Sequence, residues 1–503
     1  MGKNNTIPPF PFSTFLEDIK NQMKLVFRNL VVNDPMGLQR GIPPAVLSEI
    51  MSHNPLSACI PEEYGGRGGH VDEILALLSA ASYESLAFSL TLGINSGLFL
   101  QPVAKYAREE VKKQIFSAFL NERKMGGLMI TEPDYGTDAL NMQTFFTKNE
   151  GKYHIRGTKH WAGLTGFADY WILTARERLS GGDLNREIGF FICDVNAPGQ
   201  EIFVEEYFDN LGLHQIPYGR NRIDVVVPDA FRLEPKTSGI KLLLDLLHRS
   251  RLHFPGMAMG FIHRMMDEAF EHCKQRRVSG KYLVQYDQVQ QRLARLQASY
   301  TLTSAMCAYS SRKAGIEHDL SSYGLVANSV KSLCTDLMHE AAQSLVQLVG
   351  GKAYRYNSIG GRGIIDSRPF QIFEGSNDIL YAQITEGILK RMKTAGEHNL
   401  FRYLKNYRRT GKAALFLKDV LDFELNMQLP QRKSVDLGQV ISRIISMEMV
   451  IDLGTKKFRK DLIDNCLGVL IQDIQGLMGN FRLPDNSLFI EDYQEGSSWM
   501  NLQ

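Results

Sequence analysis

The spacing of apolar residues changes twice along the 503-residue chain, and this change constrains the fold more than any single motif. Up to about residue 125, apolar residues recur every three or four positions, as in the run from Ile74 to Leu78, which predicts helices. From about 126 to 235, short runs rich in β-branched and aromatic residues are separated by Gly, Asn and Pro, which is typical of a small antiparallel barrel or sandwich. Helical spacing then returns after Thr237 and Ser238, either of which can cap a helix.

We therefore predict a mainly α protein with a central β domain and no doubly wound sheet. A chain of this length exceeds a single core, and we divide it into an N-terminal helical domain (1–125), a β domain (126–235), a C-terminal helical bundle (236–393) and a basic helical extension (394–503). Strands are expected at 153–155, 170–173, 190–192, 202–204 and 223–227, and later helices at about 285–312, 329–348 and 378–393.

Composition excludes some classes of function. A hydrophobic fraction of 44% with 22% charged residues is that of a soluble globular protein, and a net charge of +2 gives no electrostatic reason to bind nucleic acid. The six cysteines lie far apart, which argues against a zinc site or a disulfide framework and suits a reducing compartment. The start of the chain lacks the apolar core of a secretory signal, so we expect a cytoplasmic protein.

Two stretches raise the question of membrane contact. The most apolar window, about 75–100, is interrupted by Glu84 and several serines, and we interpret it as a buried helix rather than a membrane span. In the extension, basic residues alternate with apolar ones, and they are Arg402, Lys405, Arg408, Arg409, Lys412 and Lys418. This pattern fits a helix that packs by its apolar side and exposes its basic face; contact with a membrane surface or a partner stays open.

The segment from Gln371 to Leu380 contains one carboxylate, Glu374, which follows an Ile-Phe pair and precedes Gly375. Apolar neighbours desolvate a carboxylate and raise its pKa toward the range of a general base. The alternative is structural, because the residues after Ser376 have the pattern of a helix N-terminus, which a nearby carboxylate stabilises. Spacing alone leaves both interpretations open.

Two upstream segments could bind a flat ligand beside this carboxylate. The stretch from Met129 to Asp138 joins hydroxyl side chains and a glycine in a turn, which can bind a heterocycle or a phosphate, or be an ordinary polar turn. Trp161 ends a predicted strand, either as a wall for a flavin or as part of the core. The sequence has no nucleophile elbow, zinc-helix, phosphate-loop or calcium-loop motif.

These segments, in this order and on this layout, resemble the acyl-CoA dehydrogenase family over about residues 61–393. The matches are Thr131-Glu132-Pro133 with Gly136-Thr137-Asp138, Arg156-Gly157-Thr158-Lys159-His160-Trp161, Arg276-Arg277-Val278-Ser279-Gly280, Gln347 with Gly350-Gly351, and Glu374-Gly375-Ser376-Asn377-Asp378. Five ordered matches are more specific than any one of them.

The resemblance implies non-covalent FAD between the β domain and a four-helix bundle. It implies cofactor contacts by Met129, Thr131, Gly136, Thr137, Trp161, Gly163, Arg276, Gln347, Gly351, Ser376 and Asp378. Of these, Arg276, Gln347 and Gly351 would reach the cofactor of a neighbouring subunit. It also implies substrate contacts by Thr137, Arg251 and Gly375, an electron-transferring flavoprotein as electron acceptor, and a homodimer or tetramer, with the extension favouring the dimer.

The implied reaction is α,β-dehydrogenation of an acyl thioester, in which Glu374 removes the α-proton and the β-hydride passes to flavin N5. Donors to the thioester oxygen, among them the backbone N–H of Glu374, would stabilise the enolate-like charge. Some members of the family carry the base just before the arginine that matches Arg251; that position is Ser250 here, which favours Glu374. The carrier, coenzyme A or a carrier protein, stays open, as does the acyl chain.

Several positions depart from the family pattern and bear on FAD affinity and acyl specificity. Gly163 stands where a hydroxyl residue is usual, Ser279 replaces Phe, Ile365 replaces Arg, Asp378 is shorter than Glu or Gln, and His248 replaces an acidic or polar residue. Two alternatives follow. One is a flavin oxidase or monooxygenase on the same fold, and the other is a non-catalytic assembly protein that does not bind FAD.

Overall fold

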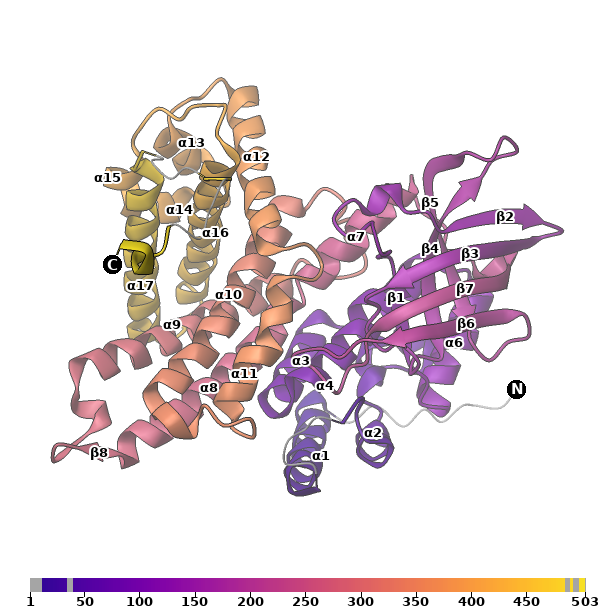
Figure 1. Cartoon of the computed structure of the whole chain (residues 1–503), viewed down its shortest axis with the longest axis horizontal. Helices are drawn as coiled ribbons and strands as arrows, with labels where there is room; N and C mark the ends of the chain where they lie inside the picture. The colour runs from indigo at the N-terminus through magenta and orange to yellow at the C-terminus, as the bar shows by residue number, and fades with distance from the viewer. Residues whose placement is uncertain (1–10, 34–38, 485–488, 492–496, 503) are drawn as a thin grey trace.

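The computed structural model describes residues 11–33, 39–484, 489–491 and 497–502. The first ten residues, on which the expected localisation partly rests, lie outside this part. The described chain has the predicted order of a helical domain, a sheet and a helical bundle, and the extension lies at the end of the bundle away from the sheet (Figure 1).

The N-terminal domain consists of helices: α1 (Phe12–Asn33), α2 (Pro44–Met51), α3 (Val71–Glu84), α4 (Leu86–Gly93), a π-helical segment (Ile94–Leu100), α5 (Gln101–Tyr106) and α6 (Glu109–Asn121). The run from Leu86 to Tyr106 is the one helix in the described residues with the length and hydropathy to cross a bilayer. Because 94% of its apolar window is buried inside the protein, it is the core of this domain. The apolar window of about 75–100 is thus buried, as predicted, but it is divided between α3 and the run that begins at Leu86.

The central domain is a seven-stranded sheet. Its strands are β1 (Gly126–Met129), β2 (Phe145–Asn149), β3 (Lys152–His160), β4 (Tyr170–Arg178), β5 (Leu184–Asp194), β6 (Gln200–Tyr207) and β7 (Gly219–Pro228). They follow the order β1-β4-β2-β3-β7-β6, with β5 on β4. Most pairs are antiparallel, as expected, but β1 and β2 each pair with β4 in parallel, which the sequence did not indicate. Along β7, buried and more exposed residues alternate, so one face of the sheet forms the core.

The bundle contains α7 (Gly239–Arg251), α8 (Phe254–Gln275), α9 (Asp287–Ser310), α10 (Gly324–Val349), α11 (Ile359–Ser367) and α12 (Asn377–Ala395). Helix α7 begins after Ser238, and α8 carries Pro255 in its first turn, where a missing N–H costs nothing. A short hairpin, β8 (Arg277–Val278) and β9 (Lys281–Tyr282), joins α8 to α9. The two turn residues, Ser279 and Gly280, have φ of +49° and +80°, a conformation that favours glycine at the second position.

The extension forms α13 (Leu400–Asn406), α14 (Gly411–Ala414), α15 (Lys418–Leu421), α16 (Gln431–Gly454) and α17 (Lys460–Arg482). The basic stretch is therefore three short helices, not the single helix that was predicted. The break has a local cause, because the Thr410 hydroxyl donates to the Leu404 carbonyl at 2.6 Å and closes the turn between α13 and α14. More than half of the residues of helix α16 are buried, and the helix packs on α10 and α12, so the extension is an integral part of the bundle.

Candidate active site

A cavity of about 300 Å³ lies between the sheet, the π-helical segment, α7 and the start of α12. It brings together eight residues that the sequence predicted for the site: Thr131, Gly136, Thr137, Trp161, Gly163, Arg251, Glu374 and Gly375. An apolar part of its wall comes from Leu90, Ile94 and Leu98 on one side and Leu243 and Leu247 on the other. The cavity thus has a polar and an apolar region, as a site for an amphipathic ligand requires.

The backbone at Glu374 is in the left-handed region, with φ of +53°, and Gly375 follows with φ of +95°. This conformation costs a non-glycine residue about 1–3 kcal/mol and persists only where the surroundings hold it. Arg251, on α7 and 7% exposed, holds it: its Nε and Nη2 donate to the Glu374 carbonyl oxygen at 3.1 and 2.7 Å. Its Nη1 donates to Asn328 Oδ1 at 2.7 Å, which ties the loop to α10.

The carboxylate of Glu374 is only partly satisfied. Ser250 Oγ donates to its Oε1 at 2.7 Å, whereas the buried Oε2 has no hydrogen-bond partner among the described residues. Burial raises the pKa of Glu374, against the hydrogen bond from Ser250 and the positive charges of Arg251 and Lys331. A buried carboxylate with one free oxygen and a raised pKa suits a general base.

Lys331 is a residue of this site that the sequence analysis missed. It lies fully buried on α10, and its Nζ donates to the Gly375 carbonyl at 2.8 Å and to Asn377 Oδ1 at 3.0 Å. Burial, followed by the nearby charge of Arg251, lowers the pKa of Lys331 to about 7. The only signal in the sequence was one lysine within an apolar stretch of a helix, which does not by itself locate a partner.

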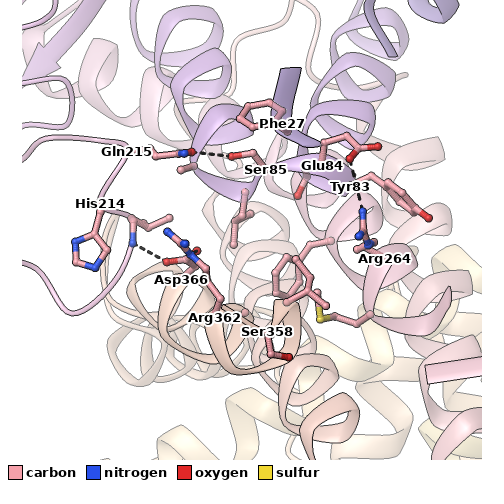
Figure 2. A pocket seen from close by; sticks show the side chains of 18 of the residues that line it. Phe27, Tyr83, Glu84, Ser85, His214, Gln215, Arg264, Ser358, Arg362 and Asp366 are labelled. Atoms are coloured by element: carbon pink, nitrogen blue, oxygen red, sulfur yellow. Dashed lines mark hydrogen bonds and ion pairs between the residues drawn. The ribbon is translucent and has the colours of Figure 1, made fainter. Parts of the chain in front are cut away.

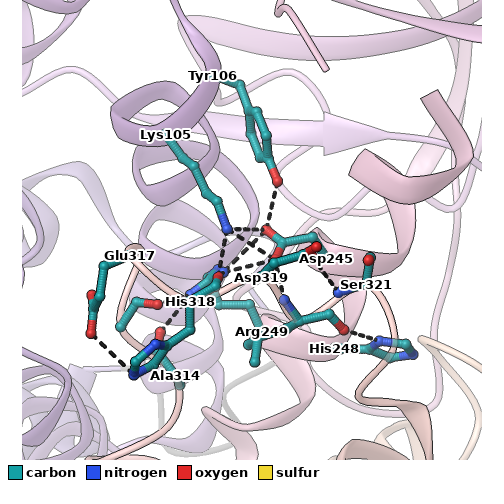
Figure 3. Close-up of polar contacts among 12 residues, drawn as sticks. Lys105, Tyr106, Asp245, His248, Arg249, Ala314, Glu317, His318, Asp319 and Ser321 are labelled. Carbon is teal, nitrogen blue, oxygen red and sulfur yellow. Dashed lines mark hydrogen bonds and ion pairs between the residues drawn. The ribbon is translucent and has the colours of Figure 1, made fainter. Parts of the chain in front are cut away.

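Helix α7, which carries Ser250 and Arg251, is fixed by a buried ionic cluster (Figure 3). Asp245, 1% exposed, accepts hydrogen bonds from Lys105 Nζ at 3.0 Å, Tyr106 Oη at 2.8 Å, Arg249 Nη2 at 2.9 Å and the Leu320 N–H at 2.7 Å. These donors come from α5, from α7 and from the loop between α9 and α10. The cluster therefore determines where Ser250 and Arg251 stand relative to Glu374.

His248, one of the departures from the family pattern, belongs to the same anchor. It is 5% exposed, and its Nδ1 lies 2.7 Å from the Leu320 carbonyl oxygen, which can only accept. Burial, followed by the charge of Arg251, lowers the pKa of His248 to about 4, so the ring is neutral near pH 7. Its role in this structure is to hold α7.

Two of the predicted motifs meet in a second buried ion pair. Lys159 Nζ, with no exposed surface, lies 3.0 Å from Glu132 Oε1 and also donates to the Ile130 carbonyl at 3.0 Å. The His160 N–H donates to the Thr131 carbonyl oxygen at 2.8 Å. These contacts hold the turn of Thr131 against the strand of Trp161, so the two segments form one wall of the cavity.

Trp161 forms an open edge of that wall. Its side chain is 53% exposed and packs on Phe208, with ring centroids 4.5 Å apart. Next to it, a Cβ added to Gly163 would lie 2.9 Å from Ile94 Cδ1 and 3.4 Å from Tyr218 Cε1. The missing side chain at Gly163 is thus explained, because the space is filled by Ile94 and Tyr218.

Six other predicted residues do not line this cavity. The Met129 side chain is buried in the core, and its carbonyl accepts from Thr174 at 3.1 Å. Ser376 precedes α12, and Asp378 is exposed in its first turn. The remaining three, Arg276, Gln347 and Gly351, are exposed at or just beyond the C-terminal ends of α8 and α10.

A larger cavity, of about 380 Å³, lies where α3, α4, α8 and α11 meet the loop before β7 (Figure 2). Its ionic groups face one another: Arg264 lies 3.6 Å from Glu84, and Arg362 lies 3.6 Å from Asp366. It contains none of the predicted site residues. In the described part of the chain, no group of three or more His, Cys, Asp or Glu side chains could hold a metal ion. The smaller cavity is therefore the candidate active site.

Family models of acyl-CoA dehydrogenase match the chain in three parts, the N-terminal domain at residues 31–123, the middle domain at 127–226 and the C-terminal domain at 237–389. An acyl-CoA dehydrogenase of Bacillus subtilis (strain 168) is 26% identical over 353 residues, which cover 69% of this chain and 90% of that protein. The short-chain specific acyl-CoA dehydrogenase of Megasphaera elsdenii is 27% identical over 352 residues, with the same coverage of 69% and 90%.

One solved structure extends the similarity of fold into the extension. An acyl-CoA dehydrogenase from Bacillus anthracis, in complex with FAD, aligns with a TM-score of 0.75 at 17% identity and covers 94% of this chain and 88% of its own. A butyryl-CoA dehydrogenase from Megasphaera elsdenii aligns with a TM-score of 0.64 at 23% identity, covering 76% and 100%. The alignment that covers 94% of this chain has to include part of the segment after residue 393.

Proposed function

Because the chain belongs to the acyl-CoA dehydrogenase family, we propose that it binds FAD and oxidises an acyl thioester between its α- and β-carbons. The observation that carries this proposal is the Glu374 carboxylate, whose buried Oε2 has no partner among the described residues and whose side chain lines the cavity. A structural carboxylate at a helix end would have both oxygens satisfied or solvated.

The residues of the cavity fit a flavin. An indole that is 53% exposed offers a flat wall, and the hydroxyls of Thr131 and Thr137 line the same cavity, where they can bond the polar edge of a flat heterocycle. A Cβ added to Gly136 would meet nothing within 4 Å, so this wall has room for a ligand. Thr131, Gly136, Thr137, Trp161 and Gly163 would hold the ring. When bound, FAD accepts the hydride that leaves the β-carbon.

Glu374 removes the α-proton through its free Oε2. Proton transfer neutralises a buried carboxylate, and burial favours the neutral form. Ser250 and Arg251 act by position: the first orients the carboxylate, and the second keeps the carbonyl of Glu374 turned away from the substrate. The backbone N–H of Glu374 makes no hydrogen bond within the described residues, and we propose that it donates to the thioester oxygen.

The apolar side chains of Leu243, Leu247 and Leu98 contact the acyl chain and exclude water from the base. We further propose a homodimer, or a tetramer, in which the exposed Arg276, Gln347 and Gly351 reach the partner's cofactor. This is supported by their exposure, and by the fact that they do not line the cavity of their own subunit. We also propose a cytoplasmic location and an electron-transferring flavoprotein as the acceptor.

The proposal is tested by anaerobic titration of the purified protein with a panel of saturated acyl-CoA thioesters. We expect a yellow protein whose flavin absorbance is lost on addition of at least one thioester, with formation of the 2-enoyl product. A matched 2,2-dimethylacyl-CoA has no α-proton and is expected to leave the absorbance unchanged. A colourless protein, or equal loss of absorbance with the blocked thioester, would contradict the proposal.

A further inference from the structure

A third cavity, of about 240 Å³, lies where the bundle meets the C-terminal extension. We call it the basic cavity, because four cationic side chains line it: Arg312 and Lys313 from the turn after α9, and Arg408 and Arg409 from the turn between α13 and α14. Half of its positive charge therefore comes from the extension. This cavity is separate from the candidate active site, with which it shares no residue.

The negative charges in the basic cavity are already engaged elsewhere. Glu448 Oε2 accepts the backbone N–H groups of Lys412 and Ala413, each at 2.9 Å, at the start of α14. Asp452 Oδ1 lies 2.7 Å from Lys412 Nζ. Across the part of the chain that the structure covers, none of the four lining cations has a carboxylate within ion-pair distance. The cavity consequently has an excess of positive charge.

One of these cations is held rigidly. Arg409 donates to the Tyr309 hydroxyl and stacks on the ring of Tyr323, with its guanidinium carbon 4.5 Å from the centroid. The hydroxyls of the two tyrosines are 2.8 Å apart. These contacts use a minority of the five N–H donors of a guanidinium. A preorganised arginine with donors to spare is suited to bind an anion.

The surroundings show the effect of this charge on a neighbouring group. Burial alone would raise the pKa of Tyr323, yet its hydrogen bonds to Tyr309 and Arg409 and the charges of Arg409 and Lys313 lower it. The charges of Arg409 and Lys313 therefore create a positive potential at Tyr323 that opposes the effect of burial. An anionic ligand experiences the same potential.

The basic cavity and the candidate active site lie on opposite sides of α10. Val326 lines the basic cavity, and Asn328, two positions later, accepts from Arg251 and donates to Gln383, both of which line the active site. Residues two apart on an α-helix point in nearly opposite directions, and a helix with its side chains is about 10–12 Å across. The two cavities are thus separated by about the width of one helix.

We propose that the basic cavity binds the phosphate groups of the carrier to which the acyl chain is attached, while the thioester lies beside Glu374. This rests on the proposed function, since an acyl carrier places its phosphates one pantetheine arm away from the sulfur. The extension then completes the substrate site by supplying Arg408 and Arg409. The shared chemistry is a phosphorylated pantetheine, which coenzyme A and an acyl carrier protein both provide.

The kinetic test compares an acyl-CoA with the corresponding acyl-pantetheine, which lacks both the phosphates and the adenosine of coenzyme A. For the double variant Arg408→Gln/Lys313→Gln, we expect KM for an acyl-CoA to rise about tenfold or more with kcat little changed, since each phosphate contact involves charged donors. For the same acyl-pantetheine, which has no phosphate, we expect KM to stay as in the parent. Lys405→Gln is the control, because it removes an exposed charge from the extension outside the cavity.

Two outcomes would overturn the inference: a KM that is unchanged for both acyl-CoA and an acyl carrier protein, or an equal rise for acyl-CoA and acyl-pantetheine. The source of the phosphate is identified by a third arm with an acyl carrier protein. A lower KM for the acyl carrier protein than for acyl-CoA, lost in the double variant, assigns the cavity to its phosphopantetheine. A lower KM for acyl-CoA assigns it to the nucleotide.

Direct binding separates this inference from the proposed reaction. Titration calorimetry of the FAD-loaded protein with adenosine 3′,5′-bisphosphate is expected to show binding that weakens about tenfold in the double variant and on raising the salt concentration. Equal binding by parent and variant contradicts the inference even if thioesters are oxidised, and so does absence of binding together with a KM for the acyl carrier protein that the double variant leaves unchanged. Binding that depends on Arg408 supports it even if no thioester tested reduces the flavin, which would contradict only the proposed reaction.

Discussion

Two buried carboxylates beside helix α7, Asp245 and Glu374, differ in how completely their oxygens are satisfied. Asp245 accepts hydrogen bonds from Lys105, Tyr106, Arg249 and the Leu320 N–H, whereas the Glu374 carboxylate accepts one, from Ser250. Burial opposes the ionisation of both groups. At Asp245, the charges and donors outweigh burial and the pKa is lowered; at Glu374, burial dominates and the pKa is raised.

The difference distinguishes a carboxylate that stabilises the fold from one that is available for chemistry. A carboxylate whose oxygens both accept several hydrogen bonds, as at Asp245, has no oxygen left for a proton. Removal of that carboxylate leaves buried cations unpaired. A buried carboxylate with an oxygen that accepts no hydrogen bond, as at Glu374, is destabilising by itself and persists only because its surroundings hold it. Asp245 positions the surroundings of Glu374, because it fixes the helix from which Ser250 and Arg251 contact Glu374.

The largest predicted effect on stability is that of Asp245→Asn. Asparagine keeps the shape of the side chain but leaves Lys105 and Arg249 buried without a counter-charge. We expect the free energy of unfolding to fall by about 3–5 kcal/mol, measured by chemical denaturation followed by circular dichroism. The control is Asp183→Asn, an exposed residue in the turn before β5. A loss below about 1 kcal/mol would show that the cluster is not the anchor of α7.

A smaller effect is expected for Gly163→Ala, which tests the fit around the cavity. The added Cβ would lie 2.9 Å from Ile94 Cδ1, the end of a flexible side chain that can shift, so we expect a cost of about 1 kcal/mol, at the low end for overpacking. Adding Ile94→Val removes that methyl group and should restore most of the melting temperature. Gly136→Ala is the matched control, because its Cβ meets nothing within 4 Å. If Gly163→Ala is neutral, or if the second change does not rescue it, the explanation of Gly163 is wrong.

The smallest effect is predicted for Ser250→Ala, in the pH dependence of flavin reduction. Only ionised Glu374 accepts a proton, so the rate rises with pH through its raised pKa. The hydrogen bond from Ser250 lowers that pKa, and its removal should move the rise to higher pH by up to about one unit. Ser238→Ala, just before α7, is the control and should leave the profile in place. A rise that stays or moves to lower pH would show that Ser250 does not act on Glu374.

The sequence predicted the order of the domains and most of the cavity, for a physical reason. Thr131, Trp161 and Glu374 each lie in a short segment with its own turn or strand pattern, and the ordered segments indicated a common site. Arg251 followed from the same resemblance, although its two hydrogen bonds to the Glu374 carbonyl did not.

What could not be predicted depends on contacts between distant segments. Lys331 donates to Gly375, and Asp245 accepts from Lys105 140 positions away, and neither pair has a local pattern. The space at Gly163 is filled by Ile94 from another domain. The break in the basic stretch depends on one hydroxyl, that of Thr410, and it brings Arg408 and Arg409 to the basic cavity.

The central claim is that Glu374, whose carboxylate accepts only one hydrogen bond, is the base. Its most direct test is the single-turnover rate of anaerobic flavin reduction by a saturating acyl thioester in Glu374→Gln, with Glu386→Gln, an exposed residue of α12, as the control. We expect Glu374→Gln to retain FAD and the melting temperature of the parent while the rate falls by about 10²–10⁴-fold, and the control to match the parent. Reduction of Glu374→Gln at the parent rate would contradict the account.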